Sequence, residues 1–176
     1  MNARWVRLGL FGMVALAAFG AGIWLRLSHT SAPPAPDAAA TIQALVLPDI
    51  DAKSQNFKQW QGKVVVVNFW ATWCGPCREE IPMFVAVQRE LGDKGLQFVG
   101  IAIDDAAKVR EFATNYKINY PLLLGTFDTF AISEKAGNKL RGLPYTLILD
   151  RQGAIAATET GGLKRERLQA LLAPLL

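Results

Sequence analysis

Cys74 and Cys77 are the only cysteines in this chain of 176 residues, and two residues separate them. In such a pair one thiolate can attack a disulfide, and the second thiol can then release the product from the mixed disulfide. A C-x-x-C pair between a strand and a helix is the expected setting for this chemistry. The spacing therefore indicates dithiol–disulfide exchange.

The segments on either side of the pair predict how it is positioned. An apolar run at 64–67, VVVV, predicts a buried strand before the cysteines. After them, spacings of three and four predict a helix, with one face made of Cys77, Ile81, Phe84, Val85, Gln88 and Leu91. Cys74 then lies at the start of the helix, where free N–H groups and the helix dipole favour an anion. We therefore expect Cys74 to ionise more readily than an isolated cysteine, with Pro76 in the first helical turn.

Three structural explanations of the pair are weaker. A purely structural disulfide would close a loop of only two residues and would stabilise little. A zinc site needs two more ligands, and the only histidine, His29, lies in a different kind of segment. Inert core cysteines fit poorly with the Gly75–Pro76 turn and with Trp73 beside them.

The segment 64–82, VVVVNFWATWCGPCREEIP, resembles the active site of the TlpA/ResA-like membrane-anchored thiol–disulfide oxidoreductases, in the thioredoxin superfamily. A second segment, 141–146 (RGLPYT), is similar to the family's segment with a cis-proline beside the dithiol. The resemblance covers about residues 41–176. It implies a thioredoxin fold and a cis Pro144, with Cys74 as nucleophile and Cys77 as resolving thiol.

Proton transfer is where the chain departs from thioredoxin itself. Thioredoxin has a buried aspartate where this chain has Asn68, and an asparagine cannot take up a proton. In the TlpA/ResA-like family a glutamate after the second cysteine is proposed for this role, and Glu80 occupies that place. Glu80 is three residues from Cys77, so the two share a helix face. The alternative is that Glu80 is a solvated surface acid, as expected for Glu79.

The resemblance also predicts how a client binds. Trp73, Gly75 and Pro76 would form an apolar rim around the dithiol. The backbone of Leu143, beside Pro144, would pair with an extended client segment by strand addition. We expect no cofactor other than the redox-active disulfide, and no metal.

An uncharged apolar run at 8–25 follows the basic segment 1–7. Its 18 residues span about 27 Å as a helix, enough to cross the hydrocarbon core of a membrane. We predict a retained signal anchor at 1–27 and a Pro/Ala-rich linker at 28–40; the alternative is a signal peptide cleaved near 30–32.

The charges around this run predict its orientation. Arg4 and Arg7 precede it and only Arg26 follows closely, so the positive-inside rule places the N-terminus in the cytoplasm. The domain would then face the periplasm, on the outer side of a bacterial cytoplasmic membrane. From residue 41 on, 16 basic and 14 acidic side chains leave a net charge of only +2, which gives no case for nucleic-acid binding.

The rest of the chain predicts an α/β domain at 41–176, with a mixed twisted sheet and helices on both faces. Asp104 or Asp105 would cap the helix at 106–116, and the helix at 127–136 would bury Phe127, Phe130 and Ala131. The other expected elements are a hairpin of strands 44–47 and 54–57, a helical turn at 59–62, strands at 96–103 and 120–124, a hairpin of 146–149 and 154–158, and a closing helix with Leu168, Leu171, Leu172 and Leu175 inward. The resemblance identifies 106–124 as an inserted αβ unit.

These features predict an extracytoplasmic oxidoreductase that reduces disulfides. The Gly-Pro dipeptide is that of thioredoxin, a reductant. The family resemblance suggests exported clients in cytochrome c maturation or metal-centre assembly, and a membrane electron donor. One alternative is a thiol peroxidase, although Thr72 is offset from the required P-x-x-x-T/S-x-x-C motif. The other is a copper-binding chaperone, which would need a histidine inside the domain.

Overall fold

The computed structural model describes residues 37–176. At its centre lies strand β3 (Val64–Trp70), and all seven of its residues are buried. Successive side chains of a strand point to opposite faces, so a strand covered on both faces needs apolar residues throughout. The run VVVVNFW meets this requirement except at Asn68.

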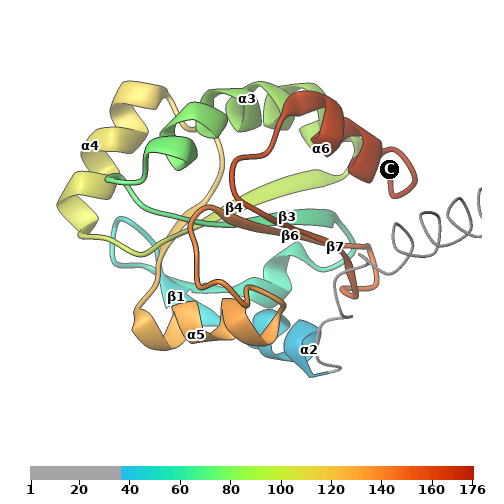
Figure 1. Ribbon diagram of the computed structural model, residues 1–176, viewed down its shortest axis with the longest axis horizontal. Helices are drawn as coiled ribbons and strands as arrows, with labels where there is room; N and C mark the ends of the chain where they lie inside the picture. The colour runs from blue at the N-terminus through green and yellow to red at the C-terminus, as the bar shows by residue number, and fades with distance from the viewer. Residues whose placement is uncertain (1–36) are drawn as a thin grey trace, which may run out of the picture. The chain divides into compact units, whose positions relative to one another are not determined.

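A five-stranded sheet forms around β3 in the order β5-β4-β3-β6-β7 (Figure 1). Strands β4 (Leu96–Ala102) and β5 (Leu122–Leu124) continue it in parallel on one side. Strands β6 (Tyr145–Leu149) and β7 (Ile155–Thr160) continue it antiparallel on the other side. The predicted mixed sheet is therefore confirmed.

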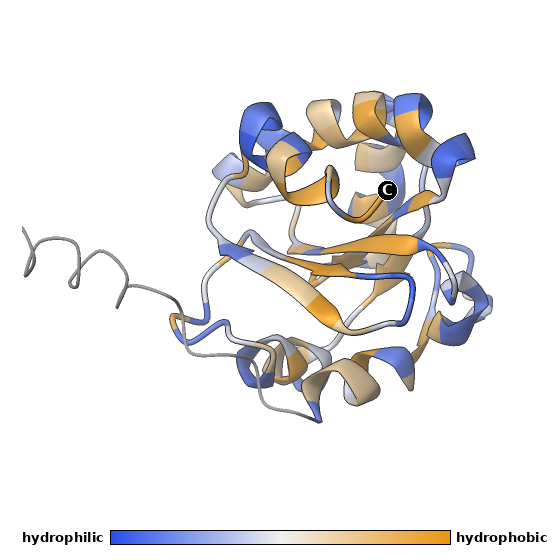
Figure 2. Cartoon of the chain, turned by 90° about the vertical axis from the view of Figure 1, so that its right-hand side faces the viewer, coloured by the Kyte–Doolittle hydropathy of each residue, from blue (hydrophilic) through white to orange (hydrophobic). Residues whose placement is uncertain are grey.

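Helices α3 (Gly75–Leu91), α4 (Ala106–Tyr116) and α6 (Arg165–Leu172) cover one face of the sheet (Figure 1). The side chains of Val64, Val66 and Trp70 point into this layer. There they share a core with Phe84 of α3, Phe112 of α4 and Leu168 of α6. In Figure 2 most of the strand ribbon is coloured as hydrophobic, whereas the helices on both sides of the sheet carry hydrophilic as well as hydrophobic residues.

The opposite face is covered by α2 (Ala38–Gln43), the 3-10 turn η1 (Phe57–Trp60) and α5 (Phe127–Lys135). The alternate β3 side chains, Val65, Val67 and Phe69, point here and pack with Ile42, Phe57 and Trp60. Fully burying a valine contributes roughly 1.5–3 kcal/mol relative to leaving it exposed, so both layers hold β3 in place.

The N-terminal hairpin is confirmed as strands β1 (Val46–Pro48) and β2 (Ser54–Asn56). The linker was predicted to extend to residue 40, but in the structure helix α2 already begins at Ala38. Ala38 and Ile42 lie one turn apart and are both fully buried. Its two buried side chains and its contacts with α5 explain why this stretch forms a helix and not a linker.

The prediction for α5 was wrong about its buried face. Phe127 is 85% exposed and Ala131 is exposed, while Thr129 and Ser133 are buried. The reason is the start of the helix, where Thr126 and Thr129 form a reciprocal capping box. This turns Thr129 inward and leaves Phe130 only partly buried.

Several other expectations agree with the structure. Helix α4 has the predicted bounds, and Asp105 caps it by accepting hydrogen bonds from the N–H groups of Ala107 and Lys108. The β6–β7 hairpin turns at Asp150 as expected. Within residues 37–176 no helix has the length and hydropathy needed to cross a membrane. The predicted span at 8–25 lies outside the described residues.

Gly100 of β4 provides a test of how tightly the α3 side is packed. A Cβ added there would meet Leu122 Cδ2 at 2.6 Å and Trp70 Nε1 at 3.0 Å. We expect Gly100→Ala to lower the free energy of unfolding by about 1–3 kcal/mol, measured by urea denaturation. Gly142→Ala is the matched control, since nothing lies within 4 Å of its Cβ. Equal effects of the two substitutions would contradict the close contact at Gly100.

Candidate active site

Cys74 lies at the N-cap of α3, four residues after the end of β3, and forms a disulfide with Cys77. The two sulfurs are 2.01 Å apart. Cys74 is 5% exposed and Cys77 is completely buried, so Cys74 is the sulfur that a client can reach. The expected position at the strand–helix junction is confirmed.

The start of α3 supports a negative charge on Cys74. The backbone N–H of Cys77 donates to Cys74 Sγ over 3.3 Å. Gly75 and Pro76 occupy the first turn, where a proline leaves no N–H unpaired. The positive end of the helix dipole thus acts on the same atom that this N–H contacts.

Asp104 fixes the loop between β3 and Cys74. From the sequence we had predicted for it only a possible role as a helix cap. Asp104 Oδ2 accepts hydrogen bonds from the backbone N–H of Thr72, over 3.0 Å, and from its hydroxyl. Burial opposes ionisation of Asp104, but these bonds and the N–H of Asp105 outweigh it and lower its pKa. Asp104 lies two residues after the end of β4, so the edge where the parallel strands end positions the active-site loop.

Glu80 lies on the buried face of α3, one turn after Cys77, and is only 4% exposed. Its Oε1 accepts from Asn68 Nδ2 of β3 over 2.9 Å. Its Oε2 accepts from the backbone N–H of Leu163 over 2.8 Å. The expected alternative of a solvated surface acid does not fit this burial.

Asn68 is the polar exception in β3, and its amide has a second partner. Asn68 Nδ2 also donates to Thr146 Oγ1 of β6 over 3.0 Å, between residues that are paired across the sheet. An asparagine can therefore donate to both Thr146 and Glu80. An aspartate here would place a second carboxylate against Glu80.

Burial raises the pKa of Glu80 to about 7, against the opposing hydrogen bonds from Leu163 and Asn68. A group with this pKa can accept and release a proton near neutral pH. The same apolar layer raises the pKa of Tyr120 through burial and through the nearby charge of Glu80.

The residues that we predicted to surround the dithiol line two separate hollows. Trp73, 67% exposed, and Leu143 line one groove, together with Ile103, Phe127 and Phe130. The other hollow contains Pro76 and Glu80 together with the loop before α6, including Leu163. The Leu143–Pro144 peptide bond is cis, as the resemblance implied, and Pro144 is buried.

Sequence reasoning missed three participants in this site. The position of Asp104 after β4 was a usable signal, because parallel strands end at one edge of a sheet. Leu163 is 83 residues from Glu80 and acts through its backbone, so nothing in its residue type indicates the contact. Phe127 was assigned to the core instead of the groove. Among residues 37–176 no group of three or more potential metal ligands occurs.

Comparison with known proteins agrees with this fold and site. The Redoxin family model matches residues 31–172, so the chain belongs to the Redoxin family. It is 33% identical to the thioredoxin-like protein YneN of Bacillus subtilis over 130 residues, covering 72% of this chain and 73% of that protein. It is 26% identical to the thiol–disulfide oxidoreductase ResA of Halalkalibacterium halodurans over 132 residues, covering 72% and 70%.

A solved structure shows the same architecture. The thiol:disulfide interchange protein of the thioredoxin family from Chlorobium tepidum superposes with a TM-score of 0.71 at 27% identity, covering 82% of this chain and 97% of that one. Together with the family and the dithiol, this likeness defines the chain as a thiol–disulfide oxidoreductase with a thioredoxin-like fold.

Glu80→Gln tests the buried carboxyl through the pH dependence of stability. The folded state raises the pKa of Glu80 from 4.5 to about 7, so its contribution is complete below about pH 4.5 and is lost as the pH rises through 7. As the pH rises from about 4.5 past 7, the free energy of unfolding of the wild type should fall by up to about 3 kcal/mol relative to that of Glu80→Gln. Urea denaturation of the oxidised protein at each pH measures this difference.

The exposed neighbour Glu79 is the matched control for this experiment. Glu79→Gln should keep the pH dependence of the wild type. Parallel stability curves for Glu80→Gln and the wild type would show that Glu80 is not held in the environment described.

Proposed function

We propose that the chain reduces disulfides of exported proteins on the outer side of the bacterial cytoplasmic membrane, tethered by an anchor at 8–25. The observation that carries this proposal is the asymmetry of the dithiol. Cys74 is the slightly exposed sulfur, at 5%, while Cys77 is completely buried one helical turn before Glu80. This arrangement suits an attacking thiolate in front and a proton-transferring group behind.

The exchange would take two steps. The Cys74 thiolate attacks one sulfur of the client disulfide, forming a mixed disulfide and releasing the other client sulfur as a thiolate. The Cys77 thiolate then attacks Cys74 Sγ, which forms the Cys74–Cys77 disulfide and releases the second client sulfur. Two electrons pass from the protein to the client, which gains two protons as its thiolates become thiols.

Glu80 would supply the proton transfer that the second step needs. Cys77 must lose its proton before it can attack, and it is fully buried. Glu80 shares the helix face of Cys77, and burial holds its pKa at about 7. An ionised Glu80 would take up the Cys77 proton and pass it towards the hollow beside Pro76 and Leu163.

Client binding would use the groove beside Trp73 and the segment before β6. Within the described residues the backbone N–H and C=O of Leu143 form no hydrogen bond, so they are available to an extended client segment. Trp73, which directly precedes Cys74, and Phe127 are 67% and 85% exposed and offer apolar surface in this groove. Exposed apolar surface of this kind is typical of protein-binding sites.

The direction of transfer rests on the dipeptide between the cysteines, Gly75–Pro76, which thioredoxin also has. We further propose a membrane electron donor that reduces the dithiol again. The clients suggested by the family resemblance are proteins of cytochrome c maturation or metal-centre assembly. The relatives named thiol–disulfide oxidoreductase ResA support the exchange chemistry, but their name identifies no client.

Trapping experiments test the roles of the two cysteines. In Cys77→Ala the mixed disulfide cannot be resolved, so the variant should accumulate disulfide-linked clients that disappear on treatment with a reductant. Cys74→Ala is the matched control and should accumulate none, because the remaining thiol is buried. Equal trapping by both variants would contradict the assignment of Cys74 as nucleophile and Cys77 as resolving thiol.

The reduction potential of the Cys74–Cys77 pair tests the direction. A reductant with the thioredoxin dipeptide should have a potential near about −270 mV, measured by equilibration with glutathione buffers. A potential well above about −200 mV would contradict the reductant role while leaving the exchange chemistry intact.

A further inference from the structure

Four cations gather at the edge of the sheet opposite the disulfide, and we call Lys58, Lys63, Lys94 and Arg151 the basic edge. Lys63 directly precedes β3, and Lys94 lies two residues before β4. Arg151 follows the end of β6, which runs antiparallel to β3 and therefore ends at this same edge. Cys74 follows the other end of β3, and seven strand residues span about 23 Å.

Contacts hold these cations next to one another. The two terminal nitrogens of Arg151 donate to the backbone carbonyls of Gly62, over 3.4 Å, and Lys94, over 3.3 Å. Lys58 and Lys63 line one hollow beside the turn that begins at Asp150. The basic edge is thus one continuous surface built from η1, two strand starts and the β6–β7 turn.

The positive charge of the basic edge is poorly compensated within residues 37–176. The four salt bridges found there are made by other cations, Arg110, Arg141, Arg165 and Arg167. The neighbouring carboxylates in the sequence are Asp93 and Asp150, and Asp150 accepts hydrogen bonds from the N–H groups of its own turn. The surface therefore keeps a net positive charge.

The chain also enters the domain at this edge. Gln43 of α2 donates from Nε2 to the carbonyl of Gly153, in the β6–β7 turn, over 2.8 Å. Helix α2 and this turn line a further hollow together with Lys58. The described part of the chain thus begins next to the basic edge, where the tether predicted from the sequence would join it.

We propose that the basic edge binds anionic phospholipid headgroups, so that the membrane holds the domain with Cys74 facing away from the bilayer. This inference rests on the membrane anchor of the proposed function. An extended Pro-rich spacer of about ten residues would reach roughly 31 Å, which would keep the domain near the surface if the sequence before α2 acts as the proposed linker. Clustered lysines and arginines are attracted to anionic lipids within about a Debye length, 8–10 Å at physiological salt.

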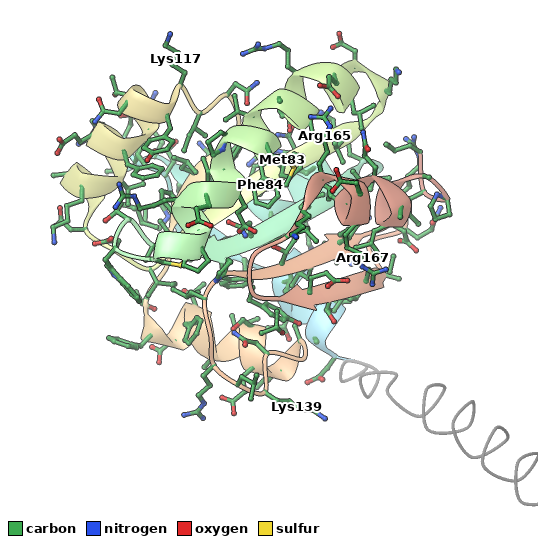
Figure 3. All side chains as sticks on the ribbon, turned by 45° about the horizontal axis from the view of Figure 1, so that its top comes forward. Met83, Phe84, Lys117, Lys139, Arg165 and Arg167 are labelled. Carbon is green, nitrogen blue, oxygen red and sulfur yellow. A yellow bond between two sulfur atoms is a disulfide. The ribbon has the colours of Figure 1, made fainter. Side chains whose placement is uncertain are left out.

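Lysine reactivity in the full chain tests the proposal. The chain is inserted into nanodiscs of phosphatidylcholine, with or without phosphatidylglycerol, and its lysines are acylated at limiting reagent and quantified by mass spectrometry. At low ionic strength we expect Lys58, Lys63 and Lys94 to react about fivefold more slowly in the anionic discs. Lys117 and Lys139, whose side chains extend into solvent elsewhere on the domain (Figure 3), are internal controls and should change little.

Salt and charge reversal sharpen this test. At about 1 M salt, where the Debye length is about 3 Å, the protection should disappear. The double variant Lys63→Glu/Lys94→Glu should abolish protection of Lys58. The matched pair in α4 and at its C-cap, Lys108→Glu/Lys117→Glu, should leave the protection of Lys58 unchanged. Equal reactivity in both kinds of disc, or equal protection of all lysines, overturns the proposal.

Two further measurements separate this proposal from the function on which it rests. Reduction of a soluble disulfide should stay within about twofold in Lys63→Glu/Lys94→Glu, because the basic edge lies about 23 Å from the dithiol. A wild-type protein that does not reduce the soluble disulfide would refute the proposed reductase function but not the membrane contact. A chain that alkaline carbonate extracts from the discs would refute the anchor, and with it the proposed contact, whatever its activity.

Discussion

Burial of β3 on both faces is the constraint on which the rest of this structure depends. Seven buried residues in one strand can be satisfied only when helices pack on each side of the sheet. The strand is then fixed in position and in register, with β4 parallel to it and β6 antiparallel. Because Cys74 follows β3 after a short loop, the redox site inherits this rigidity.

The same burial opposes ionisation of the Glu80 carboxyl beside the dithiol. Glu80 enters an apolar layer that disfavours its charge, while Asn68 and the N–H of Leu163 favour it. The balance leaves a carboxyl that changes protonation near neutral pH, one helical turn from a buried thiol. A fully apolar residue would pack more easily but could not accept a proton, so the cost in stability at this position is consistent with the proton transfer proposed for Glu80.

The two edges of the sheet differ in chemistry. The edge where β3 and β4 end carries the dithiol, the exposed rings of Trp73 and Phe127, and the loop that Asp104 holds. The opposite edge carries cations and the contact between α2 and the β6–β7 turn. This polarity would let the domain meet a membrane and a client at different ends, as the proposed tether requires.

The sequence by itself determined the strand–turn–helix unit that places Cys74 and Cys77, since helix periodicity, an apolar run and N-terminal helix chemistry act over a few residues. Local signals also predicted α4 and the β6–β7 hairpin. Only the tertiary structure decided that Glu80 is buried against Leu163 and that Phe127 faces solvent. The physical reason is range: burial and contacts between distant segments depend on how whole layers pack, and a periodic pattern leaves the rotation of a short helix such as α5 open.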